Sequence, residues 1–411
     1  MAVYSIISTL VFLTTVFAYV NHRFIKWPPT IGIMALSLMG SILIVAFGKM
    51  VPTVSAFAGH LVASINFGDV LLRIMLSFLL FAGAIHIDAN SLRQERWPVI
   101  ILATIGTLIS TAIVAVLSFG LFRLFGLGVP FIYCLLFGAL ISPTDPISVL
   151  GILKRVGIPK SLELKIAGES LFNDGVGVVI FLTILEVAQK GTASFSIGNT
   201  ALLFLREAGG GILFGFAIGY IANWFMRSID NYNVEALITL VVVICGYSLA
   251  DGLHVSGPLA IIIAGIVMGS HRKETLSATS LNYLDQFWEL MDELFNAVLF
   301  LMLGLGMLAI KIDGKLLLIS LIMVFLVLLA RWLSVLLPVK VLELFKMKFE
   351  RYAVTILTWG GLRGGLSVAM ALSLSPAMHR SEFVTITYVI VVFSVIVQGL
   401  TIGKLTRKLK V

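Results

Sequence analysis

The stretch LKIAGESLFNDGVGVVIF, residues 164–181, decides the fold, because charged and polar side chains interrupt an otherwise apolar run there. Glu169 and Asn173 are four residues apart, as are Ser170 and Asp174, so on a helix they form two adjacent stripes. Asp174 lies roughly halfway along its apolar segment. Acids at such depth in a membrane are rare because burying a charge there is expensive, so Asp174 is predicted to be functional.

The composition of the rest of the chain indicates that lipid is its solvent. Hydrophobic residues make up 59% of the 411 residues and charged residues only 12%, which is more apolar surface than a water-soluble domain can bury. Apolar runs of about 20 residues, enough to cross a hydrocarbon core of roughly 30 Å, alternate with short charged segments. We therefore predict an all-α polytopic membrane protein in which residues 1–411 form a single membrane domain.

About thirteen transmembrane helices are expected along the chain. Residues 51–66 lie between the second and third of them and are expected to form an interfacial or re-entrant piece. The expected spans are 4–20, 30–48, 69–87, 98–124, 129–152, 164–188, 201–226, 234–251, 256–269, 289–309, 315–340, 352–375 and 382–404.

Lysine and arginine are distributed unequally between the two sets of alternate loops. One set, together with the C-terminus, holds 19 of them and the other set holds 8. Since basic loops stay on the cytoplasmic side, we expect the N-terminus outside, the C-terminus in the cytoplasm, and the protein in the cell (plasma or inner) membrane. The same bias explains the net charge of +8, so nucleic acid is not an expected partner.

The fifth expected span, FGALISPTDPISVLGIL, contains two prolines. Pro143 and Pro146 bracket Thr144 and Asp145. Each proline removes a backbone donor and clashes with the preceding turn, so the helix is expected to break there. The break would expose carbonyls and half-helix ends to a cation, as in discontinuous transporter helices. A simple proline kink is the alternative interpretation.

The twelfth expected span, ILTWGGLRGGLSVAMALSL, places four glycines around Arg363, so a second interruption is expected. Arg363 lies near the middle of its span and needs a negative partner. Glu169 is the natural counter-ion, which would leave Asp174 as the free titratable acid, and Asp145 is the alternative partner. Arg331 also lies within a span, but it can extend toward the cytoplasmic face.

The two interrupted spans also suggest internal symmetry. They are seven spans apart, so they cross the membrane in opposite directions. Interrupted helices at matching places in two halves mark the site of an inverted-repeat transporter. The halves would be repeat one at about 1–190 and repeat two at about 233–405, with a linking helix at about 200–227.

The buried carboxyl of Asp174 suggests a chemistry. Desolvation disfavours the charged form, so such a group binds a proton more tightly than it would in water. It can hold either a proton or a dehydrated monovalent cation, and competition between the two is the simplest exchanger. A structural aspartate bonded to neighbouring Asn and Ser side chains is the alternative.

At these segments the sequence resembles the monovalent cation:proton antiporter-1 family, the NhaP-type sodium/proton antiporters. The matching strings are TDP at 144–146, GESLFNDG at 168–175 and WGGLRGG at 359–365. The resemblance implies an NhaA-like antiporter fold in a homodimer. Its core helices, at about 98–188 and 315–404, would move against a dimerisation domain.

The resemblance also implies roles for the site residues. Asp174 would carry both the cation and the proton, with Ser170 and Thr144 as further ligands of Na+. Asp145 and Asn173 would support the site. An Asn-Asp pair, where the electrogenic branch has Asp-Asp, implies one proton per cation.

Two further implications concern positions around the site. The resemblance assigns Glu169 and Arg363 to a buried structural ion pair. Many relatives carry an acid near the ion in the third span, whereas residues 79–84 read LLFAGA here, and Ala82 removes that ligand. The sequence therefore does not decide between Na+ and K+.

The predicted function is secondary active transport that exchanges Na+ or Li+ for H+, electroneutrally and one for one, with no cofactor besides the transported ions. A K+/H+ antiporter and a proton-uncoupled cation channel are the alternatives, although the filter-like run TVGYG is absent. Neither an HExxH zinc motif nor a GxSxG serine elbow is present, so an enzyme is not expected.

Overall fold

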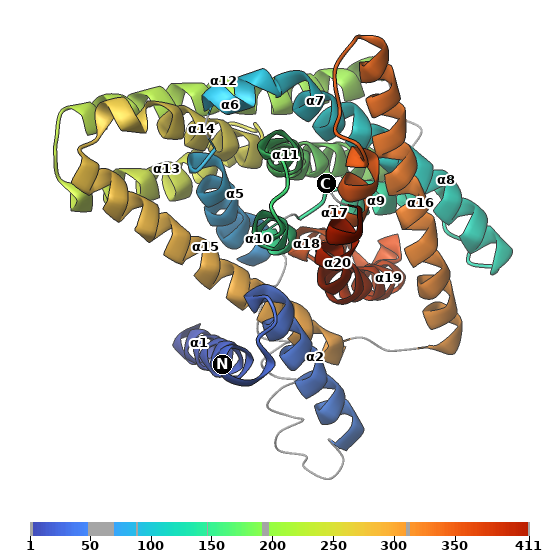
Figure 1. Cartoon of the computed structure of the whole chain (residues 1–411). Helices are drawn as coiled ribbons and strands as arrows, with labels where there is room; N and C mark the ends of the chain where they lie inside the picture. Colours follow the sequence, from blue (N-terminus) through green and yellow to red (C-terminus); the bar gives the residue numbers. More distant parts are fainter. Residues whose placement is uncertain are drawn as a thin grey trace.

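The computed structural model describes residues 3–47, 70–87, 89–145, 147–190, 197–309 and 313–409, and every regular element within them is a helix (Figure 1). The piece expected at 51–66 and the second proline, Pro146, lie outside the described residues. The elements in chain order are α1 Val3–Val20, η1 Asn21–Ile25, α2 Pro29–Phe47, η2 Val70–Met75, α5 Leu76–Ile85, α6 Ala89–Gln94, α7 Arg96–Ile101, η3 Leu102–Gly106, α8 Thr107–Leu124, α9 Phe131–Ile141, α10 Ile147–Val156, α11 Lys160–Lys190, α12 Ile197–Arg227, α13 Tyr232–Gly252, α14 Gly257–Thr275, α15 Ala278–Gly306, η5 Met307–Ala309, α16 Gly314–Leu344, α17 Ala353–Gly360, α18 Gly365–Ser373, η6 Pro376–Met378, α19 Arg380–Phe393, η7 Ser394–Gln398 and α20 Gly399–Leu409.

The helices fall where the apolar runs predict them, because backbone polar groups in lipid must be satisfied within the segment. Each expected span coincides with one helix or with consecutive helical pieces. Among the described residues, eight helices are long and apolar enough to cross a membrane, and three shorter apolar helices occupy further expected spans. The all-α membrane fold is confirmed, while the number of thirteen crossings stays a prediction.

Both predicted interruptions are present. The fifth expected span is divided into α9 and α10, with non-helical backbone at Pro143 and Thr144. The twelfth is divided into α17 and α18, and the backbone at Gly361 and Gly364 leaves the helical region. Proline in the first break and glycine in the second therefore end the helices for different reasons.

The helices pack in two groups, with α11 where the groups meet (Figure 1). In one group, α8, α9, α16, α18 and α19 pack on one another; in the other, α12 and α13 pack on α14, which packs on α5. The glycines Gly211, Gly215 and Gly219 of α12 lie against α14 and permit close helix approach. Because α11 contacts α9 on one side and α12 and α14 on the other, its polar residues lie between the groups.

Candidate functional site

The two interruptions contact each other directly. The backbone N–H of Asp145 in the first break donates to the carbonyl of Leu362 in the second, at 2.8 Å. In return, the guanidinium of Arg363 donates to the carbonyls of Ser142 and Pro143, the latter at 2.9 Å. A broken helix leaves such carbonyls without an intrahelical partner, and a cation favours the negative C-terminal end of a half-helix. Arg363 therefore closes the end of α9.

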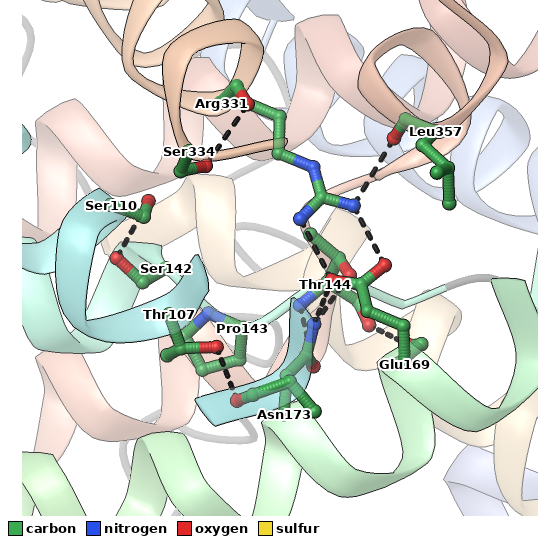
Figure 2. A network of polar contacts seen from close by, with 12 residues as sticks. Thr107, Ser110, Ser142, Pro143, Thr144, Glu169, Asn173, Arg331, Ser334 and Leu357 are labelled. Carbon is green, nitrogen blue, oxygen red and sulfur yellow. Dashed lines mark hydrogen bonds and ion pairs between the residues drawn. The ribbon is translucent and has the colours of Figure 1, made fainter. Parts of the chain in front are cut away.

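Thr144, Asn173 and Ser170 form one hydrogen-bonded cluster between the first break and α11, and Figure 2 shows the first two of them. The amide of Asn173 donates to the hydroxyl of Thr144 at 2.8 Å and accepts from the Thr144 backbone N–H at 3.2 Å. The hydroxyl of Ser170 donates to the carbonyl of Thr144. All three side chains are buried. The four-residue spacings on α11 and the broken backbone together bring these groups into contact.

The partner of Glu169 is Arg331, so the predicted pair of Glu169 with Arg363 is wrong. Figure 2 shows the Arg331 side chain extending from α16 to Glu169, and two parallel hydrogen bonds of 2.8 Å join the guanidinium to the carboxylate. Arg331 also donates to the carbonyl of Leu357 at 3.1 Å. The carboxylate accepts a further bond of 2.9 Å from Asn173.

Arg363 does not pair with Glu169 because the carbonyls that the first break leaves without an intrahelical partner bind its guanidinium. Arg363 lies in the second break, where its guanidinium is used by the carbonyls of the first break, and its own N–H donates to Ser394 at 2.9 Å. Arg331 is 6% exposed, and its guanidinium is bound by Glu169 and Leu357 inside the protein, so the expectation that it extends toward the cytoplasmic face is wrong. A planar fork matches a carboxylate bidentately, so burial of both charges is compensated.

Asp174 and Asp145 both line a cavity of about 150 Å³ between the two groups of helices. Ser170 lines it as well. Thr144 is not a lining residue but contacts Ser170 through its carbonyl, and Asn173 in turn contacts Thr144. None of the described residues forms a hydrogen bond or ion pair with the Asp174 carboxylate. The structure thus brings all five predicted binding residues to one place, and leaves Asp174 as the acid facing the cavity without a partner there.

Sequence reasoning missed three residues at this site. Arg331 was expected to extend toward the cytoplasmic face, although an arginine inside an apolar run usually pairs with a buried negative group. Asn296 and Ser367 also line the cavity. The signal for Asn296 was present in its segment, ELFNAVLFLM, where it is the only polar residue among eight apolar neighbours that follow the acid.

The chain is similar to known proteins along nearly its whole length. The family model for the sodium/hydrogen exchanger, transmembrane, matches residues 10–408. The Na+/H+ antiporter NhaP of Pseudomonas aeruginosa is 44% identical over 409 residues, which cover 98% of this chain and 96% of that relative. The Na+/H+ antiporter NhaH of Halobacillus dabanensis is 32% identical over 397 residues, covering 94% and 93%. The solved structure of the sodium proton antiporter MjNhaP1 from Methanocaldococcus jannaschii at pH 8 covers 100% of this chain and 99% of its own, with a TM-score of 0.75 and 23% identity, which shows a common fold.

Proposed function

Because the chain belongs to the family of transmembrane sodium/hydrogen exchangers, a family of transporters and not of enzymes, we propose that it exchanges one Na+ or Li+ for one proton. Asp174 is the shared carrier, holding either the cation or the proton. The named relatives are Na+/H+ antiporters, and their similarity over nearly the whole chain supports the choice of ions.

The contrast between two acids of α11, Glu169 and Asp174, is the observation that carries this proposal. Glu169 is held by two hydrogen bonds from Arg331 and one from Asn173. Asp174, slightly more than one turn further along, faces the cavity with no partner among the described residues. A locked acid cannot exchange its partner at each cycle, whereas an open one can take a proton and release it to a cation.

The surroundings of Asp174 supply oxygen atoms for a dehydrated monovalent cation. Ser170 and Asp145 share the cavity wall with it, and the carbonyl of Thr144 lies at the hydroxyl of Ser170. Hard cations take oxygen ligands of these kinds. The amide of Asn173 fixes Thr144 in place, so Asn173 supports the site without adding a second titratable group beside Asp174.

One open carboxyl beside a neutral amide supports an exchange of one proton per cation. In that case a difference of one pH unit supplies about 1.4 kcal/mol and balances a tenfold cation gradient. Membrane voltage contributes nothing to such an electroneutral cycle. If two protons crossed per cation, about 100 mV would contribute about 2.3 kcal/mol.

The setting of this exchange is also part of the proposal. The distribution of lysine and arginine supports a protein of the cell membrane with the N-terminus outside and the C-terminus in the cytoplasm. The group containing α8–α11 and α16–α20 would move as a core against a dimerisation domain within a homodimer. Its cellular role would be regulation of internal pH and sodium.

Proteoliposomes that contain a pH dye, with the voltage clamped by an ionophore, test the proposal directly. Pulses of Na+ and Li+ should each release trapped protons, K+ should release far fewer, and the rate should not respond to voltage. Asp174→Asn should abolish the exchange, while Glu186→Gln, an acid on the same helix outside the cavity, should keep it. Exchange that survives Asp174→Asn would remove the carrier role, and a steep voltage response would remove the one-to-one ratio.

A further inference from the structure

The walls of the Asp174 cavity differ sharply in chemistry. Polar side chains on the side of the interrupted helices and α11 are Asp145, Ser170, Asp174 and Ser367. The lining residues contributed by η2 and α5 are Leu71, Met75, Leu76, Leu79, Leu80 and Gly83, which offer no side-chain oxygen. On that second side, α15 supplies the one polar side chain among the described lining residues, Asn296.

The orientation of the Asn296 amide is fixed by its own helix. Its nitrogen donates to two oxygens of Asp292, the backbone carbonyl at 2.9 Å and the carboxylate at 3.0 Å. Both partners are acceptors, so the NH2 group and not the oxygen must face them. The amide oxygen is left buried without a donor in the described part of the chain, although Asn296 is only 2% exposed.

A buried amide oxygen without a donor requires an explanation, because nearly all such atoms in native proteins have a partner. Ser367, on the facing wall, shows the same property: it is 1% exposed and its hydroxyl has no partner among the described residues. The carboxylates of Asp145 and Asp174 line the same cavity. An amide oxygen, a hydroxyl and carboxylates around one small cavity are ligands suited to a hard cation.

We propose that Asn296 is a cation ligand on the wall opposite α11, with Asp292 as the positioning residue that turns its oxygen away from α15. This inference rests on the proposed exchange of Na+ or Li+ and extends the site across the boundary between the two helix groups. α15 packs mainly on α2 and on α5 of the second group, and it meets the interrupted helices at α18, so its ligand comes from outside α11 and the first break. The cation gains this contact when the cavity has the shape seen here, so Asn296 sets apparent affinity and ion preference.

Removing the oxygen tests the assignment. Asn296→Ala should raise the KM for Na+ by about fivefold to tenfold, equivalent to roughly 1–1.4 kcal/mol of lost cation binding, and should leave kcat within about twofold. Asn296→Ser, which keeps an oxygen, should raise the KM less. Asp292→Asn should also raise the KM for Na+. In this variant the ratio of the KM for Na+ to the KM for Li+ should change as well. Asn282→Ala, an exposed asparagine on the same helix outside the cavity, should match the unmodified protein.

A binding measurement separates this inference from the proposed function. Na+ should raise the thermal unfolding temperature of the unmodified protein more than that of Asn296→Ser, whether or not proton exchange is detected. An unmodified protein without cation-driven proton flux would overturn the exchange function. Normal exchange with an unchanged KM and an unchanged Na+-induced thermal shift in the Asn296 variants would overturn the ligand role, as would an equal fall in kcat for every variant at constant KM.

Discussion

The two interrupted helices are built from opposite chemistry. The break between α9 and α10 contains Pro143 and presents acid and hydroxyl side chains, whereas the break between α17 and α18 is made of glycines and presents Arg363. Each break satisfies the other: Arg363 donates to carbonyls of the first, and Asp145 donates its N–H to the second. Neither interruption is complete alone, so the proposed cation site depends on backbone that the other half of the chain supplies.

The largest expected effect comes from removing the charge that ties the second break to α11. Arg331→Ala leaves the Glu169 carboxylate buried with no positive partner and frees the Leu357 carbonyl of α17. Breaking a buried ion pair on one side costs about 3–5 kcal/mol. The unfolding temperature in detergent should fall accordingly.

Lys340→Ala provides the matched control, because it removes an exposed ion pair with Glu343 on the same helix, α16. Such surface pairs are worth about 0–1 kcal/mol. Arg331→Lys should recover only part of the stability, because lysine cannot form the two parallel bonds. Equal stability of Arg331→Ala and Lys340→Ala would mean that the buried pair does not hold the second break in place.

The second largest effect is expected from removing the guanidinium that the second break contributes to the first. Arg363→Ala leaves the carbonyls of Ser142 and Pro143 without a donor at the end of α9. Hydrogen bonds to charged groups contribute about 1.5–3 kcal/mol, so the free energy of unfolding should fall by about that amount. Exchange should fall strongly, because the backbone that loses these hydrogen bonds holds Thr144 and Asp145 in position at the proposed site.

Transport and thermal unfolding should both be measured for this variant, with Arg123→Ala as the control, since Arg123 is an exposed arginine at the end of α8. Arg363→Lys should retain the positive charge at the end of α9 and part of the exchange. If Arg363→Ala transports normally, the mutual dependence of the two breaks is wrong.

The sequence predicted the breaks better than it predicted what joins them. Pro143 and the glycines around Arg363 end helices by local rules, and the spacing from Glu169 to Asp174 is a property of one helix. The partner of a buried charge is not local, because residue order gives the depth of a side chain but not its direction. Two arginines, Arg331 and Arg363, lie within expected spans. Only the packing of α16 against the other helices determines that Arg331 is the one that reaches Glu169.

The same limit explains why Asn296 was not predicted. A lone asparagine in an apolar run has no distinctive spacing, and its meaning comes from the helices that face it. The Asn296 oxygen stands out because Leu79, Leu80 and Gly83 on the same side of the cavity offer no side-chain oxygen. These residues come from a segment more than 200 residues earlier in the chain. Ala82, suspected from the sequence to weaken the site, is buried and is not among the residues that line the cavity.

A smaller effect should distinguish two glycines of the second interrupted span, Gly364 in the break and Gly360 at the end of α17. A methyl group on Gly364 would lie 2.6 Å from a carboxylate oxygen of Asp145 and 2.7 Å from its Cβ, so Asp145 must move. Overpacking of this kind costs about 1–3 kcal/mol, and Gly364→Ala should reduce exchange several-fold. Gly360→Ala is the control, since its methyl would meet Val149 at an ordinary 3.5 Å. Two alanine variants with equal activity would show that the contact between the breaks tolerates displacement.

The smallest expected effect lies at the segment between α16 and α17, which leads into the second interrupted span and contains Glu350. Glu350 accepts hydrogen bonds from Ser161 and from Lys165, which lies 3.2 Å from both carboxylate oxygens. Burial raises the pKa of Glu350, but these hydrogen bonds lower it by more, so its pKa lies below the ordinary value of 4.5. The folded state therefore binds this proton less readily than the unfolded state, and the contact contributes stability that is complete above about pH 4.5 and is lost as the pH falls through the folded pKa.

Ser161→Ala should remove about 1 kcal/mol of this stability at neutral pH, the usual net value of one hydrogen bond. Thermal unfolding followed from pH 7 down to about pH 3 should show a constant difference between variant and unmodified protein near neutrality, and a shrinking difference below about pH 4.5, where protonation removes the same contact from both. A difference that grows on acidification would mean that Glu350 is protonated more readily in the folded state. The segment between α16 and α17 would then contact Lys165 of α11 through the ring of Phe349, whose centroid lies 5.1 Å from Nζ, and Lys165 would keep its ion pair with Glu95 at 3.4 Å.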